Sequence, residues 1–413
     1  MLLHYLRRAG QAGLFALATL LAACGGGTDP VSGSGNSTGG QSSSSSLGQL
    51  AISLTDSQGC DYKSVWVTVE QVRIHQSSTA DDGGGGWRDL NLSPARRVDL
   101  LALRNGVFVD LGTIEQLPAG KYTQVRLVLA ENGNKAPFAN QLDLADGTPV
   151  ALKTPSAQQS GLKLKVDVNV EPGGIGKLVL DFDPCRSVVK AGNSGRYNLK
   201  PVIRAYVNPT NDIEGYTVPG AIVSAQQGGV SLKSTTADTT GKFVLWPVDA
   251  GSYDVVVTGA GLPNLVLTGV QVIEGRVTVS TVITPLLPVP TVPTPPFGLV
   301  SGTVTVNSIG TNLIDADLRA LQTVGNYPNS LLPLVIEAAT TSADADLGTY
   351  AFSLPSAAPQ RAVWEAGVTK YDFTPVAGQA GLYTVEARAA GFASPKFETA
   401  DLSVANPVDF TFP

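Results

Sequence analysis

The chain has 413 residues, a formal net charge of -6 and 15% charged residues. Its length predicts two to four domains. The sparse and slightly negative charge provides no basic patch of the kind that nucleic-acid binding requires, so nucleic acid is not an expected partner. Only two histidines are present, which excludes a metal site built from several histidines in the mature chain.

Residues 1–23 have the pattern of a bacterial signal peptide. Arg7 and Arg8 give a positive start, and residues 12–21 form an apolar run that is too short to span a bilayer. The run ends in Leu21-Ala22-Ala23-Cys24, which resembles the lipobox of bacterial lipoproteins. The resemblance implies that Cys24 is lipidated and that membrane lipid is a partner through this residue. The alternative is an ordinary secretory signal with a coincidental cysteine.

Cys24 is followed by Gly25 rather than an aspartate. By resemblance to lipoproteins of enteric-type bacteria, this favours the outer membrane over the inner membrane. The expected location is therefore the cell envelope, on the periplasmic side or the cell surface. After Cys24, residues 24–47 are nearly all small and polar, which predicts a flexible tether.

The rest of the chain predicts an all-β protein with tandem β-sandwich domains. It contains 45 glycines and 27 prolines, and its apolar residues alternate over short runs without a long helical period. The first domain, residues 48–208, begins with alternating strands at 50–54 and 65–69. A glycine-rich loop at 81–86 predicts a hairpin tip, and further strands are expected at 107–111, 122–129, 162–170, 177–182 and 199–207.

Two cysteines remain once Cys24 is assigned to lipid. Cys60 and Cys185 form an even pair in an oxidising compartment, which predicts a disulfide. Such a bridge would stabilise the domain by about 4 to 5 kcal/mol through the entropy of the unfolded chain. The alternative is two free buried thiols.

Several stretches of residues 48–208 together resemble one family, the domain of unknown function that is widespread in bacterial lipoproteins. That resemblance implies no activity. The stretches are Leu54-Thr55-Asp56, Ser64-Val65-Trp66-Val67-Thr68-Val69, Leu117-Pro118-Ala119-Gly120-Lys121-Tyr122, Gln159-Ser160-Gly161-Leu162-Lys163-Leu164, Leu180-Asp181-Phe182-Asp183 and Tyr197-Asn198-Leu199-Lys200-Pro201-Val202-Ile203.

Residues 211–284 contain a turn from Asp238 to Gly241, followed by Gly251 and Tyr253 at the start of an apolar strand. With the flanking glycines, this segment resembles a carboxypeptidase regulatory-like domain, a small transthyretin-like sandwich that implies an accessory role. A proline-rich linker is expected at 285–298. Residues 299–413 repeat the pattern as a second regulatory-like sandwich, with an insertion at 313–332 predicted to hold a short helix or a loop.

Few residues are candidates for chemistry. His75 falls on the polar side of an alternating run, which favours a solvated strand histidine over a catalytic base. Asp181 and Asp183 flank Phe182 and therefore share one strand face, and Asp56 is a further carboxylate elsewhere in the domain. A solvated face is favoured over an acid pair or a cation site. Asp344, with Asp346 and Gly348, lacks the further ligands of a calcium loop, so a plain turn is predicted.

Trp66 and Trp87 are the candidates for stacking against a ligand, with packing in the core as the alternative for each. No cofactor, metal or catalytic residue is expected. The sequence predicts a non-enzymatic binding or scaffold protein of the envelope, with an envelope polysaccharide or protein as partner. The alternatives are a carbohydrate-binding surface protein and a glycan hydrolase that uses two carboxylates.

Overall fold

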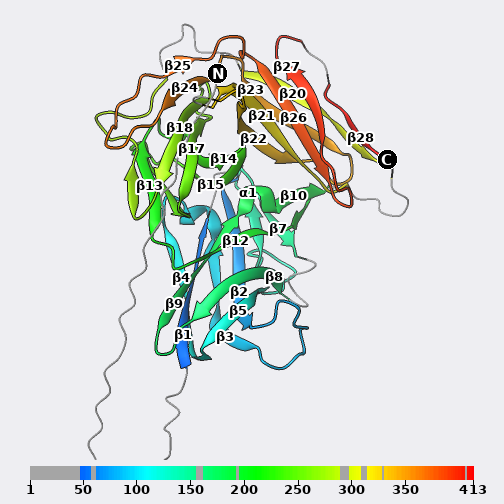
Figure 1. Ribbon diagram of the computed structural model, residues 1–413. Coiled ribbons are helices and arrows are strands. Elements are labelled where there is room, and N and C mark those ends of the chain that lie inside the picture. Colours follow the sequence, from blue (N-terminus) through cyan, green and yellow to red (C-terminus); the bar gives the residue numbers. More distant parts are fainter. Residues whose placement is uncertain are drawn as a thin grey trace, which may run out of the picture. The chain divides into compact units, whose positions relative to one another are not determined.

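The computed structural model describes residues 47–56, 62–154, 161–191, 195–288, 297–307, 314–327, 330–404 and 407–413. These residues form strands with very little helix, which confirms the all-β prediction (Figure 1). The predicted signal peptide, Cys24, Cys60, nearly all of the tether and most of the proline-rich linker lie outside the described residues. Within the described part, no helix has the length and apolar character needed to cross a membrane.

The first region consists of two sheets. The smaller sheet contains, in spatial order, β12 (Val202–Val207), β9 (Ile175–Asp183), β1 (Leu47–Asp56) and β4 (Phe108–Pro118). The larger contains β10 (Val188–Ala191), β11 (Arg196–Leu199), β7 (Pro149–Lys153), β6 (Gln141–Asp143), β2 (Ser64–His75), β5 (Gly120–Leu129) and β8 (Leu162–Val170), with β3 (Arg88–Asp99) paired to β2. Two short helical segments, η1 (Leu100–Leu103) and α1 (Pro184–Ser187), complete the region.

The core of this region follows from the alternation in the sequence. Leu50, Ile52 and Leu54 point to one face of β1 and are fully buried in a cluster with alternate residues of β2. The strand predicted at 199–207 is two strands instead. Pro201 has no N–H to donate to a ladder, and at this point the chain passes from β11 in the larger sheet to β12 in the smaller one.

The middle region also pairs two sheets around one core. The first contains β16 (Lys242–Val248), β13 (Asn211–Tyr216) and β19 (Arg276–Thr278). The second contains β15 (Val230–Thr236), β14 (Ile222–Gln227), β17 (Gly251–Thr258), β18 (Leu265–Val272), β24 (Gln360–Val363) and β25 (Thr374–Pro375). The turn predicted at Asp238 is confirmed, because its Oδ1 accepts from the backbone N–H groups of Thr240 and Lys242 at 2.8 and 3.0 Å.

The C-terminal region also has two sheets. The first contains, in spatial order, β23 (Thr349–Pro355), β20 (Phe297–Val306) and β28 (Phe410–Phe412). The second contains β22 (Pro333–Ser342), β21 (Ala316–Asn326), β26 (Leu382–Ala389) and β27 (Lys396–Asp401). The prediction of a helix or loop at 313–332 is wrong over most of its length. Leu318 and Ala320 are fully buried on one face of β21, which pairs with both β22 and β26.

One segment of the C-terminal part belongs to the middle sheet. β24 pairs in parallel with β18, from Leu265 beside Gln360 to Thr268 beside Val363. Phe373 then packs in the core of the middle region. A second apolar cluster joins the two regions through Val256, Val266, Val324, Leu334 and Ile336, all fully buried. These contacts join the middle and C-terminal regions through both a backbone ladder and a shared core.

The motif Ala-Gly-x-Tyr recurs once in each region. Tyr122 donates its hydroxyl to the Pro118 carbonyl at 2.9 Å, and Tyr253 donates to the Asp249 carbonyl at 2.8 Å. Tyr383 occupies the corresponding place in β26 and donates at 2.7 Å to the carbonyl of Pro355, which lies 28 residues away in the sequence. Burial raises the pKa of all three phenols, so each remains a hydrogen-bond donor at neutral pH.

Candidate functional site

A buried ion pair joins the first region to the middle region. Nζ of Lys233 on β15 lies 2.6 Å from Oδ1 of Asp181 on β9, and the two side chains are 2% and 0% exposed. The same ammonium group donates to the backbone carbonyl of Asp56 at 2.9 Å. The prediction of a solvated face is therefore wrong for Asp181, because Lys233 covers this part of β9.

Arg204 on β12 extends the contact beside this pair. Its guanidinium donates to the backbone carbonyls of Leu232 and Ser231 at 2.7 and 3.3 Å. Asp181 and Asp183 line a cavity here of about 20 Å³. A cavity of that size holds about one water molecule and no sugar ring.

Asn105 makes a second contact between the same two regions. Its Nδ2 donates to the Lys242 carbonyl at 3.3 Å, and its Oδ1 accepts from the Val244 N–H at 3.1 Å. The amide thus bonds to the edge strand β16 at two points, as a neighbouring strand would. Its own backbone N–H donates to the Thr235 hydroxyl at 3.0 Å.

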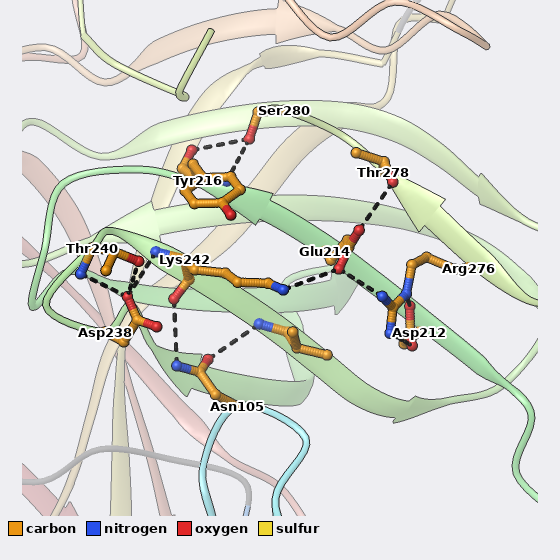
Figure 2. A network of polar contacts seen from close by, with 11 residues as sticks. Asn105, Asp212, Glu214, Tyr216, Asp238, Thr240, Lys242, Arg276, Thr278 and Ser280 are labelled. Atoms are coloured by element: carbon orange, nitrogen blue, oxygen red, sulfur yellow. Dashed lines mark hydrogen bonds and ion pairs between the residues drawn. The ribbon is translucent and has the colours of Figure 1, made fainter. Parts of the chain in front are cut away.

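Figure 2 shows that Asn105 lies beside a chain of charges on β13, β16 and β19. Arg276 binds both carboxylate oxygens of Asp212, at 2.8 and 2.9 Å, and also contacts Glu214 at 2.9 Å. Nζ of Lys242 lies 3.7 Å from the same carboxylate oxygen of Glu214, Oε2. Two acids and two bases neutralise one another here, so the network fastens the short strand β19 to β13.

Asp183 differs from Asp181 in both its contacts and its pKa. It caps α1, accepting from the Arg186 N–H at 3.0 Å. Burial raises its pKa from 3.8 to about 6, and the nearby carboxylates of Asp181 and Glu337 add to the rise, while the cap bond and the charge of Arg186 oppose it. This carboxyl group therefore takes up a proton under mildly acidic conditions.

The raised pKa predicts that Asp183 lowers stability as the pH rises. The folded state holds this proton more tightly than the unfolded state, so its contribution is fully present below pH 3.8 and is lost as the pH passes about 6. The full shift corresponds to about 3 kcal/mol, which partial exposure reduces to about 1 to 2 kcal/mol. Asp183→Asn keeps the cap acceptor and should raise the free energy of unfolding at pH 7.5 by that amount.

Urea unfolding at pH 4.0 and pH 7.5 measures this effect. In the Asp183→Asn variant, the free energy of unfolding should lose the part of its pH dependence that arises from Asp183. At pH 4.0 this free energy should exceed that of the wild type only slightly. Equal pH dependence in the two proteins would contradict the assignment. Asp167→Asn serves as a control, since its side chain is 74% exposed and its change should be within about 0.5 kcal/mol.

The two candidate tryptophans lie in different environments. Trp87 is 9% exposed, and Arg73 and Arg126 lie over its ring at 4.9 and 4.8 Å. Packing, rather than ligand stacking, therefore describes Trp87. Trp66 is half-buried, with Arg97 over its ring at 4.1 Å. Stacking of a ligand on Trp66 stays a prediction and is restricted by this cation.

The remaining predicted positions have simple surroundings. His75 is half-buried, with Nε2 3.0 Å from the Gly85 carbonyl and its ring beside Trp87. Asp344 forms the predicted turn, accepting from two backbone N–H groups at 3.0 Å each. Cys185 lies half-buried in α1, and because Cys60 is outside the described residues the disulfide stays a prediction. In the described part, no cluster of His, Cys, Asp and Glu side chains fits a metal ion.

Sequence reasoning missed Lys233, Arg204 and Asn105. Lys233 shares its strand face with Ser231 and Thr235, a pattern that predicts a solvated lysine, so its burial could not be read from the sequence. Its partner Asp181 lies 52 residues earlier and in another region. Asn105 could be noticed only as the residue before Gly106 in a short loop.

Comparison with known proteins gives one family match and distant structural likeness. A streptococcal ancillary pilin aligns at 11% identity over 88% of this chain and 97% of its own, with a TM-score of 0.16. The major pilin SpaD from Corynebacterium diphtheriae aligns at 12% identity over 88% and 96%, also with a TM-score of 0.16. Likeness this low assigns neither function nor domain arrangement. No curated protein matches the chain.

The family match covers the first region. Residues 47–201 match the family described as Domain of unknown function (DUF4382), in agreement with the resemblance found for residues 48–208. The likeness of the two later segments to carboxypeptidase regulatory-like domains stays a prediction. Asp181, Asp183 and Asn105 all fall within the matched residues. The chain therefore contains a DUF4382 domain, and this domain supplies Asp181 to the buried ion pair with Lys233.

Proposed function

We propose that the chain is a lipid-anchored protein of the bacterial cell envelope that acts as a non-enzymatic scaffold. The observation that carries the scaffold role is the buried pair of Lys233 and Asp181 between the first and middle regions. With the β18–β24 ladder, it joins successive regions by contacts of the kind found inside domains. Such contacts suit a protein that holds a binding surface in a fixed orientation.

The proposed anchor is the lipid on Cys24. Each buried methylene contributes about 0.8 kcal/mol, so several acyl chains hold a protein on a membrane where one chain is marginal. The proposed non-enzymatic role is supported by the way the acidic side chains are used. Asp181, Asp212 and Glu214 are ion-paired, and Asp183 caps a helix beside a cavity of about 20 Å³.

Membrane fractionation with labelled palmitate tests the anchor. The wild-type chain expressed in a Gram-negative host should carry the label and sediment with the outer membrane. Cys24→Ser should lose both properties. Gly25→Asp is the matched control, since it should keep the label and move to the inner membrane. A wild-type chain that is soluble and unlabelled would contradict the proposal.

A further inference from the structure

A large cleft borders the C-terminal region. It has a volume of about 810 Å³ and is lined by β14, β22 and β23, with β10 at one side. This volume lies in the range of about 300 to 1,000 Å³ that is typical of sites for small ligands. β22 and β23 are edge strands of their two sheets, so the cleft lies where this sandwich is open.

The lining of the cleft mixes polar and apolar side chains, and hydroxyl groups form a large share of its polar part. Thr340, Thr341 and Ser342 line it from the end of β22, and Ser353 lines it from β23. Such hydroxyl groups both donate and accept hydrogen bonds, which suits a ligand that carries many hydroxyl groups.

The charged side chains in the cleft do not select an ion. Glu337 is 5% exposed and pairs with Arg319 at 3.1 Å. Asp344 is 8% exposed and accepts two backbone N–H groups. Lys190 is exposed to solvent, where a single ammonium binds an anion weakly. The cleft therefore favours a neutral ligand.

Asn264 supplies a second, independent sign of a ligand. Its side chain is 1% exposed and lines the cleft. Nδ2 donates to Oε1 of Gln322 at 2.8 Å, which fixes the amide, while Oδ1 has no hydrogen-bond partner among the described residues. A buried acceptor without a donor has a free-energy cost in the folded state. A ligand hydroxyl or N–H at this point would recover that cost.

An aromatic ring completes the set. Phe297, at the start of β20, also lines the cleft and is 40% exposed. A partly exposed aromatic ring in a cleft that also carries hydroxyl and amide groups suits the C–H face of a sugar ring. We propose that this cleft binds a short neutral oligosaccharide, with Asn264 accepting a hydrogen bond from a sugar hydroxyl. The inference goes beyond the proposed scaffold role and uses none of the residues of the anchor.

Titration calorimetry tests the inference with defined probes. The full lipidated chain, in a detergent without a sugar headgroup, is titrated with maltotetraose, cellotetraose and chitotetraose. Ala351 is exposed on β23 and lines the cleft, so Ala351→Trp fills it from the surface without altering the core. Thr305→Trp is the matched control on an exposed position of β20 outside the cleft.

At least one tetrasaccharide should bind to the wild type and to Thr305→Trp alike. Binding should weaken at least tenfold in Ala351→Trp, and Thr341→Val should weaken it while leaving the melting temperature unchanged. No binding by any tetrasaccharide at millimolar concentration would overturn the inference. So would binding that Ala351→Trp leaves intact, or binding of a neutral Gly-Ser-Thr peptide in place of the sugars. The membrane fractionation of Cys24→Ser does not depend on sugar binding, so it tests the anchor separately.

Discussion

Replacing Lys233 by methionine should destabilise the protein by about 3 to 5 kcal/mol, because it leaves the Asp181 carboxylate buried without its ammonium partner. Methionine keeps most of the side-chain volume, so the loss comes mainly from the charge rather than from a cavity. Urea unfolding measures it as a lower transition midpoint. The double variant Lys233→Met/Asp181→Leu should recover most of the loss, since apolar residues can replace a buried ion pair at little cost.

The exposed pair of Lys121 and Asp167 is the matched control. Its atoms lie 2.8 Å apart, but the side chains are 59% and 74% exposed. Lys121→Met should therefore change stability by less than about 1 kcal/mol. A Lys233→Met variant that is no less stable than Lys121→Met would show that the contact between the first and middle regions is not formed in solution.

Replacing Gly241 by alanine should have a comparable effect through the backbone. Gly241 has φ +82, and a Cβ atom there would lie 2.1 Å from the Thr217 carbonyl oxygen. The left-handed backbone costs about 1 to 2 kcal/mol for an alanine, and relief of the clash adds about 1 to 3 kcal/mol. Thermal unfolding should show a total loss of about 2 to 5 kcal/mol.

Two further alanine variants separate the cost of the left-handed backbone from the cost of the steric clash. Gly220 has φ +79, and a Cβ atom there would meet nothing within 4 Å, so Gly220→Ala should show the backbone cost alone. Gly348 has φ +68 and a Cβ there would lie 2.2 Å from the Val304 carbonyl, so Gly348→Ala should match Gly241→Ala. If Gly241→Ala and Gly220→Ala were equally stable, the close approach of Thr217 would be disproved.

The sequence was informative where structure depends on neighbours along the chain. The alternation of Leu50, Ile52 and Leu54 predicted a strand and its buried face, because successive side chains point to opposite sides of a sheet. Asp238 and Gly241 predicted their turn, because the required backbone geometry and the accepting carboxylate are local. The recurrence of this turn at Asp344 and Gly348 follows from the same reasoning.

Features that depend on the meeting of distant segments were not predictable. Asp181 looked solvated because its strand alternates, and only the approach of Lys233 buries it. Nothing in residues 360–363 indicates pairing with β18, since backbone hydrogen bonds carry no sequence signature. Trp87 was a candidate for ligand stacking, but two arginines from β2 and β5 lie over its ring.

The central claim is that the first and middle regions are held in one fixed arrangement. Spin labels at Lys165→Cys on β8 and Glu274→Cys after β18, both exposed positions, allow the distance between the regions to be measured by pulsed electron resonance in a Cys24→Ser background. We expect a single narrow distance distribution, which Lys233→Met should broaden. A broad or multiply peaked distribution in the protein with Lys233 intact would contradict the scaffold that we propose.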